Sequence, residues 1–292
     1  MSLTQVRDTV VLPFMEGLTA PSEAWRQCFE VRTDDAPSVK LASYSGIGAI
    51  PEWDGSENIS QADVNDRYNT TLSYTKYALQ VRLNKYDLRD VPGLLENAVR
   101  KLGVAVANTY GSIGADRLAD VYDVTSTAGD GVALISDSHP LASGGSRDNK
   151  LTSAFDRSAF MAAINLASLW VSYHGQEEDW SGDDLVMYGS PQDTTLRETV
   201  VEVFGSSVSS DQMQTNAAAG YNVSPVIWSK LTDSTRWGII SRSRTPLVYW
   251  IRSGAEQSID IDEDNRGTKI TVDFAIGTQV KPDPVGIIGS DA

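Results

Sequence analysis

The feature that most constrains this chain is a long pair of extended segments between residues 43 and 84. The second segment has the period of two of a half-buried strand, with alternate apolar residues at Tyr77, Leu79, Val81 and Leu83. Leu72 and Tyr74 lie on the other parity, which predicts a bulge or break near Lys76. We therefore predict a long β-hairpin. Because a two-stranded hairpin is only marginally stable in water, we expect a neighbouring subunit to support it.

A long helix is predicted after the hairpin. Asp90 is its expected N-cap and Pro92 lies near its first turn. The helix should run to about Tyr110 and resume as far as Val121, with apolar residues on one face at Leu95, Val99, Leu102 and Val106. Gly103, among alanines, indicates that another backbone approaches this helix closely.

A helix, a buried strand and a second helix are predicted between residues 153 and 205. The first helix begins near Ser153, the strand covers residues 185–188, and the second helix ends at Gly205. This order is typical of one α/β layer. After Asn222 the pattern changes to strands, of which the clearest has alternate apolar residues at Ile270, Val272, Phe274 and Ile276.

Charge and hydropathy exclude several classes of protein. The net charge of −15 disfavours direct nucleic-acid binding, which needs clustered Lys and Arg. No segment approaches the roughly 20 apolar residues of a membrane helix, so we expect no membrane partner. Arg7 and Asp8 interrupt the place where a signal peptide would be apolar, which predicts folding in a cytoplasm.

Cysteine and histidine offer few candidates for chemistry. The single cysteine, Cys28, excludes an internal disulfide, and we interpret it as a buried structural thiol rather than a nucleophile. His139 and His174 lie far apart and have no partner at metal-ligand spacing. Asp137 and His139 are one candidate acid/base or ion-binding pair. The favoured alternative is a loop histidine before Pro140 that caps a turn.

Two further motifs fail in detail. Three alternating aspartates resemble the start of a calcium loop: Asp260, Asp262 and Asp264. Asn265 then stands where the loop needs Gly, and Thr271 where it needs Glu, so we predict a solvated strand face that ends in a turn. Gly111, Ser112 and Gly114 lack the spacing of a nucleophile elbow. We therefore predict no catalytic, cofactor-binding or metal-binding residue, and no cofactor.

Aromatic residues are abundant, with seven tryptophans and eleven tyrosines. Several stand in loop-like places, among them Trp53, Tyr86, Trp180 and Tyr221. Core packing explains most of them. Aromatic side chains are also enriched in contacts between proteins, so a protein with several large interfaces would have the same composition.

Three stretches resemble one family: residues 94–122 followed by 131–140, residues 184–206, and residues 236–277. Their order over residues 43–289 is similar to that of the major capsid proteins of tailed phages with the Hong Kong 97 fold, and particularly of Mu-like head subunits. The resemblance implies an α+β subunit whose spine helix covers residues 94–120. It also implies a division into an N-terminal arm (1–40), an extended loop (41–84), a peripheral domain with the spine helix (85–149), an axial domain (150–252), and a peripheral-domain sheet with the C-terminus (253–292).

The function implied is mechanical rather than enzymatic. Such a subunit forms homo-hexamers and homo-pentamers and closes an icosahedral shell around double-stranded DNA, without sequence-specific binding. The implied partners besides other copies are a scaffolding protein, a portal protein and a decoration protein. The implied location is the virion, after assembly in the host cytoplasm. Lys76 lies in the extended loop, but we predict no covalent cross-link.

Two other functions are kept as alternatives. One is an encapsulin-like nanocompartment shell, which has the same fold and an enzyme cargo. The other is an acidic cytoplasmic hydrolase that uses Asp137 and His139. A monomer with a deep pocket at His139 would favour the hydrolase.

Overall fold

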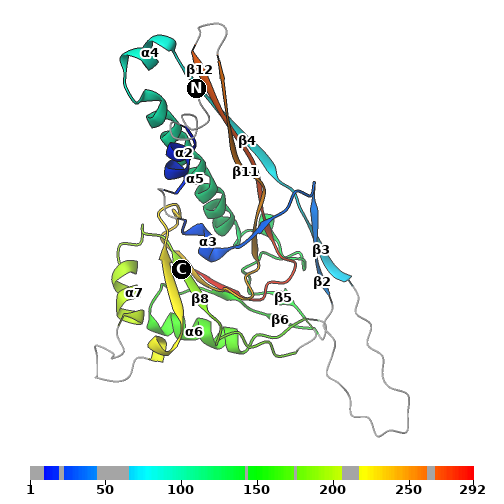
Figure 1. Ribbon diagram of the computed structural model, residues 1–292. Coiled ribbons are helices and arrows are strands. Elements are labelled where there is room, and N and C mark those ends of the chain that lie inside the picture. Colours follow the sequence, from blue (N-terminus) through cyan, green and yellow to red (C-terminus); the bar gives the residue numbers. More distant parts are fainter. Residues whose placement is uncertain are drawn as a thin grey trace.

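Two sheets and one long helix organise the chain, as Figure 1 shows. The computed structural model describes residues 10–19, 23–44, 66–141, 144–173, 176–205, 217–261 and 267–292. Helices and strands both contribute to the cores, so the predicted α+β class is confirmed. Within these residues no helix is long and apolar enough to cross a membrane.

The first sheet has four strands in the order β1-β11-β12-β4. Their bounds are β1 Glu30–Thr33, β11 Leu247–Ile261, β12 Thr268–Val280 and β4 Thr75–Leu83. β1 is parallel to β11, and the other neighbours are antiparallel. The alternating apolar residues of β12 face the core, which confirms the strand predicted there. The pairing of β11 with β12 is irregular between Ile251 and Glu256, where the register shifts.

The helix α5, Leu94–Asp120, packs on one face of this sheet. Its Tyr110 ring contacts the Phe274 ring edge-on at 5.1 Å, and the Tyr249 hydroxyl donates to the Tyr110 carbonyl. The predicted apolar face is buried. The helix bounds equal those implied by the family resemblance, and the interruption expected after Tyr110 is absent from this described helix.

The predicted N-cap of α5 is wrong. Asp90 is the last residue of a separate short helix, α4 (Lys85–Asp90), and Asn84 caps α4 by accepting from the Tyr86 N–H. Gly93, with φ of 76°, forms the turn into α5. Two helix-start signals lie within a few residues here, and the sequence pattern alone does not separate them.

The close approach predicted at Gly103 is confirmed. A Cβ atom at Gly103 would lie 2.3 Å from the Phe14 carbonyl oxygen of α2 (Leu12–Thr19). A Cβ atom at Gly17 would lie 2.1 Å from the Arg100 carbonyl oxygen. The two helices therefore touch backbone to backbone, as only glycine permits. A short helix, α3 (Trp25–Cys28), follows α2 in the chain.

The second sheet has five strands in the order β7-β13-β10-β8-β9. Their bounds are β7 Lys150–Leu151, β13 Ile287–Asp291, β10 Arg236–Ser241, β8 Leu185–Gly189 and β9 Val223–Ile227. The helices α6 (Arg157–Ser168) and α7 (Leu196–Phe204) pack against it and enclose a second core. The helix–strand–helix order predicted for this region is confirmed. β13 belongs to this sheet, whereas β12 belongs to the first.

A separate two-stranded sheet extends away from the rest (Figure 1). It pairs β2 (Val39–Tyr44) with β3 (Asp66–Leu72). The prediction of one hairpin over residues 43–84 is therefore wrong in its second half, because β4 pairs with β12 instead. The break lies at Ser73 and Tyr74, just before the predicted Lys76.

Short elements complete the described chain. They are the 3-10 turns η2 (Val124–Ser126) and η3 (Ala217–Gly220), and the paired strands β5 (His139–Pro140) and β6 (Ser146–Arg147).

Candidate functional site

His139 lies in a fully buried polar cluster. Its Nδ1 lies 2.7 Å from Asp130 Oδ2, and its Nε2 lies 3.2 Å from Asn149 Oδ1. The Asn149 amide nitrogen donates to the carbonyls of Leu134 and Ile287, and its oxygen accepts from the Ser136 N–H, so the orientation of the amide is fixed. Both ring nitrogens of His139 thus face oxygen atoms, of Asp130 and of Asn149, which fix the orientation of the ring.

The electrostatics of Asp130 agree with its contact with His139. Burial alone would raise its pKa, but the hydrogen bond and charge of His139, the Val132 N–H and the Arg147 charge outweigh burial and lower the pKa below its ordinary value. The Arg147 guanidinium lies 4.6 Å from the Trp170 ring centroid. The cluster joins the loop after α5 to β6 and β13, and its role is to hold these segments together.

The candidate pair of Asp137 and His139 does not form. His139 is bonded to Asp130 and Asn149 and has no exposed surface, while Asp137 is exposed. The interpretation of His139 as a turn cap is also wrong, since it is a buried member of a polar network. His139 has no exposed surface, so it does not open into a deep pocket, the sign expected of a hydrolase. His174 lies outside the described residues.

The other candidate residues have structural surroundings. Gly111 and Gly114 lie within α5, against Lys230 and against Trp228 and Trp25 respectively, and Ser112 accepts from Lys230. Asp260 lies near the end of β11, whereas Asp262 and Asp264 lie outside the described residues. Among the described residues, no three His, Cys, Asp or Glu side chains are grouped so as to hold a metal ion.

Cys28 is buried, as predicted, and burial raises the pKa of its thiol to about 12 against a smaller opposing effect of Arg242. At pH 8 the thiolate fraction is therefore on the order of one in ten thousand. We expect a thiol reagent such as DTNB to leave the folded protein unlabelled for hours and to label it at once in denaturant. An exposed thiol in an Asn97→Cys variant, as control, should react within minutes. Rapid labelling of native Cys28 would contradict its burial.

Glu178 lies beside Asp283, Arg244 and Arg147. Burial first, and then the Asp283 charge, raise the pKa of Glu178, with the two arginines acting in the opposite direction. A raised folded-state pKa means that ionised Glu178 destabilises the protein above that pKa and has no effect below the unfolded value. Glu178→Gln should therefore stabilise the subunit at pH 7, by less than about 1 kcal/mol after solvent screening. Thermal melting at pH 7 and near pH 3.5 tests this, and the gain should vanish at the lower pH.

The tryptophans fill cores rather than surfaces. Those within the described residues are all buried: Trp25, Trp170, Trp180, Trp228, Trp237 and Trp250. Trp53 lies outside the described residues. Tyr86 is exposed over 68% of its surface, so it fits the expectation of an aromatic residue at an interface better than Trp180 does.

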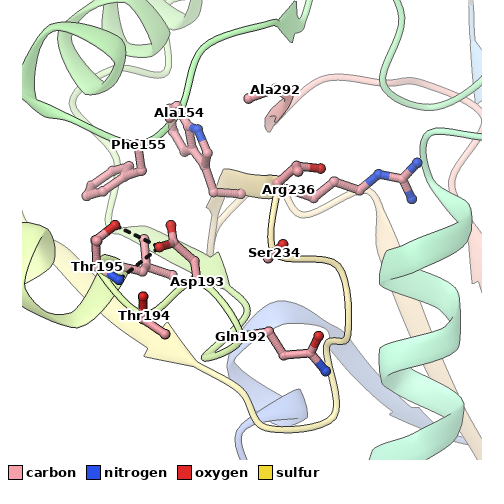
Figure 2. A pocket seen from close by; sticks show the side chains of 12 residues that line it. Ala154, Phe155, Gln192, Asp193, Thr194, Thr195, Ser234, Arg236 and Ala292 are labelled. Atoms are coloured by element: carbon pink, nitrogen blue, oxygen red, sulfur yellow. Dashed lines mark hydrogen bonds between the residues drawn. The ribbon is translucent and has the colours of Figure 1, made fainter.

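One hollow of about 460 Å³ lies next to α7 (Figure 2). Its wall includes Phe155, Trp237 and the turn that holds Asp193. The Asp193 carboxylate accepts from the N–H and hydroxyl of Thr195, and the Arg236 guanidinium turns toward α5, where it donates to the Ala119 carbonyl. Both charged side chains of the wall are thus bonded within the chain, and the contact between Asp193 and Thr195 is a local turn.

The surface of the subunit has two notable features, the hairpin β2–β3 and a group of exposed apolar side chains near α2. The hairpin β2–β3 is linked to the first sheet by the Thr70 hydroxyl, which donates to the Val280 carbonyl. Apolar side chains are exposed by 40–49% on and beside α2, at Val11, Leu12 and Met15. Exposed apolar groups of this kind are typical of surfaces that contact another protein.

No curated protein sequence matches this chain. The sequence profile of one family, phage capsid protein, matches residues 70–289, well over half of the chain. The chain belongs to this phage capsid protein family.

Solved capsid structures share the fold of this capsid protein. The capsid of cyanophage P-SCSP1u has a TM-score of 0.61 at 10% identity, covering 92% of this chain and 87% of the other. The capsid of Ralstonia phage GP4 has a TM-score of 0.61 at 12% identity, covering 95% and 89%. The resemblance to tailed-phage major capsid proteins is therefore confirmed. The narrower likeness to Mu-like head subunits stays a prediction.

A third similar structure is the virus-like particle from Pyrococcus furiosus. Its TM-score is 0.53 at 13% identity, and the match covers 96% of each chain. The functional parts of this capsid protein are thus its surfaces, and sequence reasoning identified the hairpin but not the exposed residues of α2. The sequence around α2 has no regular hydrophobic pattern, so it does not distinguish the exposed apolar residues from those in the core.

Proposed function

We propose that this capsid protein assembles into pentamers and hexamers that close an icosahedral shell around double-stranded DNA. The family match carries the proposal, and the hairpin β2–β3 supports it. The hairpin extends away from both sheets in Figure 1 and forms a two-stranded sheet of its own. Such a hairpin gains stability when it lies against another copy, so folding and assembly are coupled.

The division into domains follows the two sheets. The peripheral domain would comprise the four-stranded sheet and α5, and the axial domain the five-stranded sheet with α6 and α7, which assigns β13 to the axial domain and not to the peripheral segment 253–292 expected from the sequence. Residues 1–40 would form the N-terminal arm, whose helix α2 packs on α5. In the shell, the axial domains meet around the five-fold and six-fold axes.

The subunit acts without catalysing a reaction. Its net charge of −15 suits a wall that repels packaged DNA, so the DNA is held without sequence-specific contacts and can leave the head. A scaffolding protein, a portal protein and a decoration protein complete the set of partners, and assembly takes place in the host cytoplasm.

A nanocompartment shell with a protein cargo is the second candidate. The similarity to the virus-like particle from Pyrococcus furiosus, which extends over 96% of both chains, favours it. The two candidates share the shell and differ in what the shell encloses.

Electron microscopy of the purified protein, with size-exclusion chromatography, tests the proposal. We expect closed shells, or rings of five and six subunits, and nuclease-protected DNA in particles from a phage-producing host. A monomer that stays small at every concentration and with added scaffolding protein would overturn the shell. Shells that hold protein and no DNA would favour the nanocompartment.

A further inference from the structure

The four-stranded sheet has two open edges, one along β4 and one along the part of β11 that β1 does not cover. β1 pairs with β11 only at Val248–Ile251, so the described residues place no strand beside the rest of β11. On the opposite side, β4 is the terminal strand of the sheet. Open edges present unpaired backbone N–H and C=O groups, which readily pair with another chain.

These two edges have opposite charge. β4 contains Lys76 and Arg82 and no acidic residue, whereas the open part of β11, residues 252–261, contains Glu256 and Asp260. Its one basic residue, Arg252, donates to the Asp35 carbonyl and lies over the Tyr74 ring. The other four charged side chains are exposed. The register places them on one face of the sheet, because Arg82 pairs with Lys269 and Lys269 with Asp260, while Ala78 and Glu256 both pair with Asp273.

The other face shows a matching pattern of apolar residues. Leu79 on β4 is 53% exposed and Ile259 on β11 is 38% exposed. Their register partners, Val272 and Ile270, are buried on the face that α5 covers. Each open edge thus exposes one large apolar side chain on the α5 face.

Edge charges often serve only to prevent aggregation. That role needs charge of any sign, and like charges on both edges would perform it best, since they would repel every edge of every other copy. Opposite charges leave the β4 edge attractive to the β11 edge. The difference in sign therefore indicates recognition.

We propose that the β4 edge of one copy docks along the β11 edge of a second copy. This inference deepens the proposed function and rests on it. β4 and β11 run in the same direction, since both are antiparallel to β12, so a copy displaced along the sheet can place Arg82 opposite Asp260, with Lys76 then two residues along the strand from the position opposite Glu256 and diagonal to it. Leu79 and Ile259 then lie on one face and cover each other.

The contact joins two different surfaces, and this geometry generates rings when the rotation closes. A two-fold contact would instead place β4 against β4 and bring like charges together. The charges thus select ring formation and suppress the two-fold alternative, which is the usual effect of complementary charges at an interface.

Charge reversal tests the proposal. One variant carries Lys76→Glu and Arg82→Glu, and another carries Glu256→Lys and Asp260→Lys. We expect each to raise the concentration needed for shell assembly by about tenfold or more, because like charges then face each other. All four substitutions in one chain restore opposite charges and should return this concentration to within about threefold of the unmodified value. Light scattering and electron microscopy measure assembly, and circular dichroism confirms folding.

A matched control separates the edge contact from net charge. It combines Lys76→Glu and Arg82→Glu with Asp116→Lys and Glu198→Lys, two exposed positions away from the edges, so that the net charge is unchanged. This variant should stay defective. The inference is overturned if the control assembles normally, if the fourfold variant stays defective, or if both double variants assemble like the unmodified protein. Failure of the unmodified protein to assemble would instead overturn the proposed function.

Discussion

A subunit in which residues 45–65 are replaced by a two-residue Asn-Gly turn is expected to fold normally and to make no shells. Tyr44 and Asp66 are register partners, so a tight turn joins β2 and β3 without strain. The replacement should leave the cores intact, because it retains Leu41 and Leu72, the described side chains of the hairpin that are buried. We expect the concentration needed for shell assembly to rise at least about a hundredfold, which corresponds to a loss of about 2.8 kcal/mol per subunit.

Melting temperature and far-UV circular dichroism should match those of the unmodified subunit, and electron microscopy counts the shells. A second variant replaces the same residues by a 21-residue Gly/Ser linker, which keeps the length and removes the side chains. Both variants should fail to assemble. Shells at normal yield from the turn variant would show that residues 45–65 have no role between subunits.

Asn149→Leu should destabilise the unassembled subunit by about 4 kcal/mol, since each buried polar group that loses its partner costs about 1–3 kcal/mol. The affected groups are the carbonyls of Leu134 and Ile287, the Ser136 N–H and the His139 ring. Leu has the same branching and the same number of side-chain heavy atoms as Asn, so the substitution leaves no cavity and the expected loss comes from hydrogen bonding.

Chemical denaturation of the unassembled subunit measures the free energy of unfolding. Asn97→Leu on the exposed side of α5 is the matched control and should change this free energy by less than about 0.5 kcal/mol. A loss below about 1 kcal/mol for Asn149→Leu would show that water replaces the amide and that the cluster does not hold the segments together.

Hydrophobic patterns in the sequence predicted the helices and strands whose structure depends mainly on residues close together in the chain. The buried face of α5, the strand β12 and the order α6, β8, α7 follow from hydrophobic periodicity. The interruption expected after Tyr110 does not occur, although the helix there contains Gly111 and Gly114, residues of low helix propensity. In the structure these glycines admit Lys230 and Trp228 against the helix, so tertiary packing outweighs propensity.

Partners that lie far apart in sequence could not be predicted in the same way. Asp130 and Asn149 stand in loops without periodicity, and they meet His139 because β13 fixes the position of Asn149. The pairing of β4 was mistaken for the same reason, since its alternation fits a strand beside β3 as well as one beside β12. Periodicity shows that a strand has a buried face and does not identify its neighbour.

The sheet that supports α5 also determines when the subunit can finish folding. Glu30 pairs with Val248, and Thr75 pairs with Ile276. β1 and β4 therefore cannot pair with their neighbours until the ribosome has made about two hundred further residues. At typical rates of synthesis that delay is on the order of ten seconds or more. Contacts of such long sequence separation form slowly. Until β11 and β12 emerge from the ribosome, the apolar faces of β4 and α5 have no sheet to cover them, and molecular chaperones have their longest opportunity to bind.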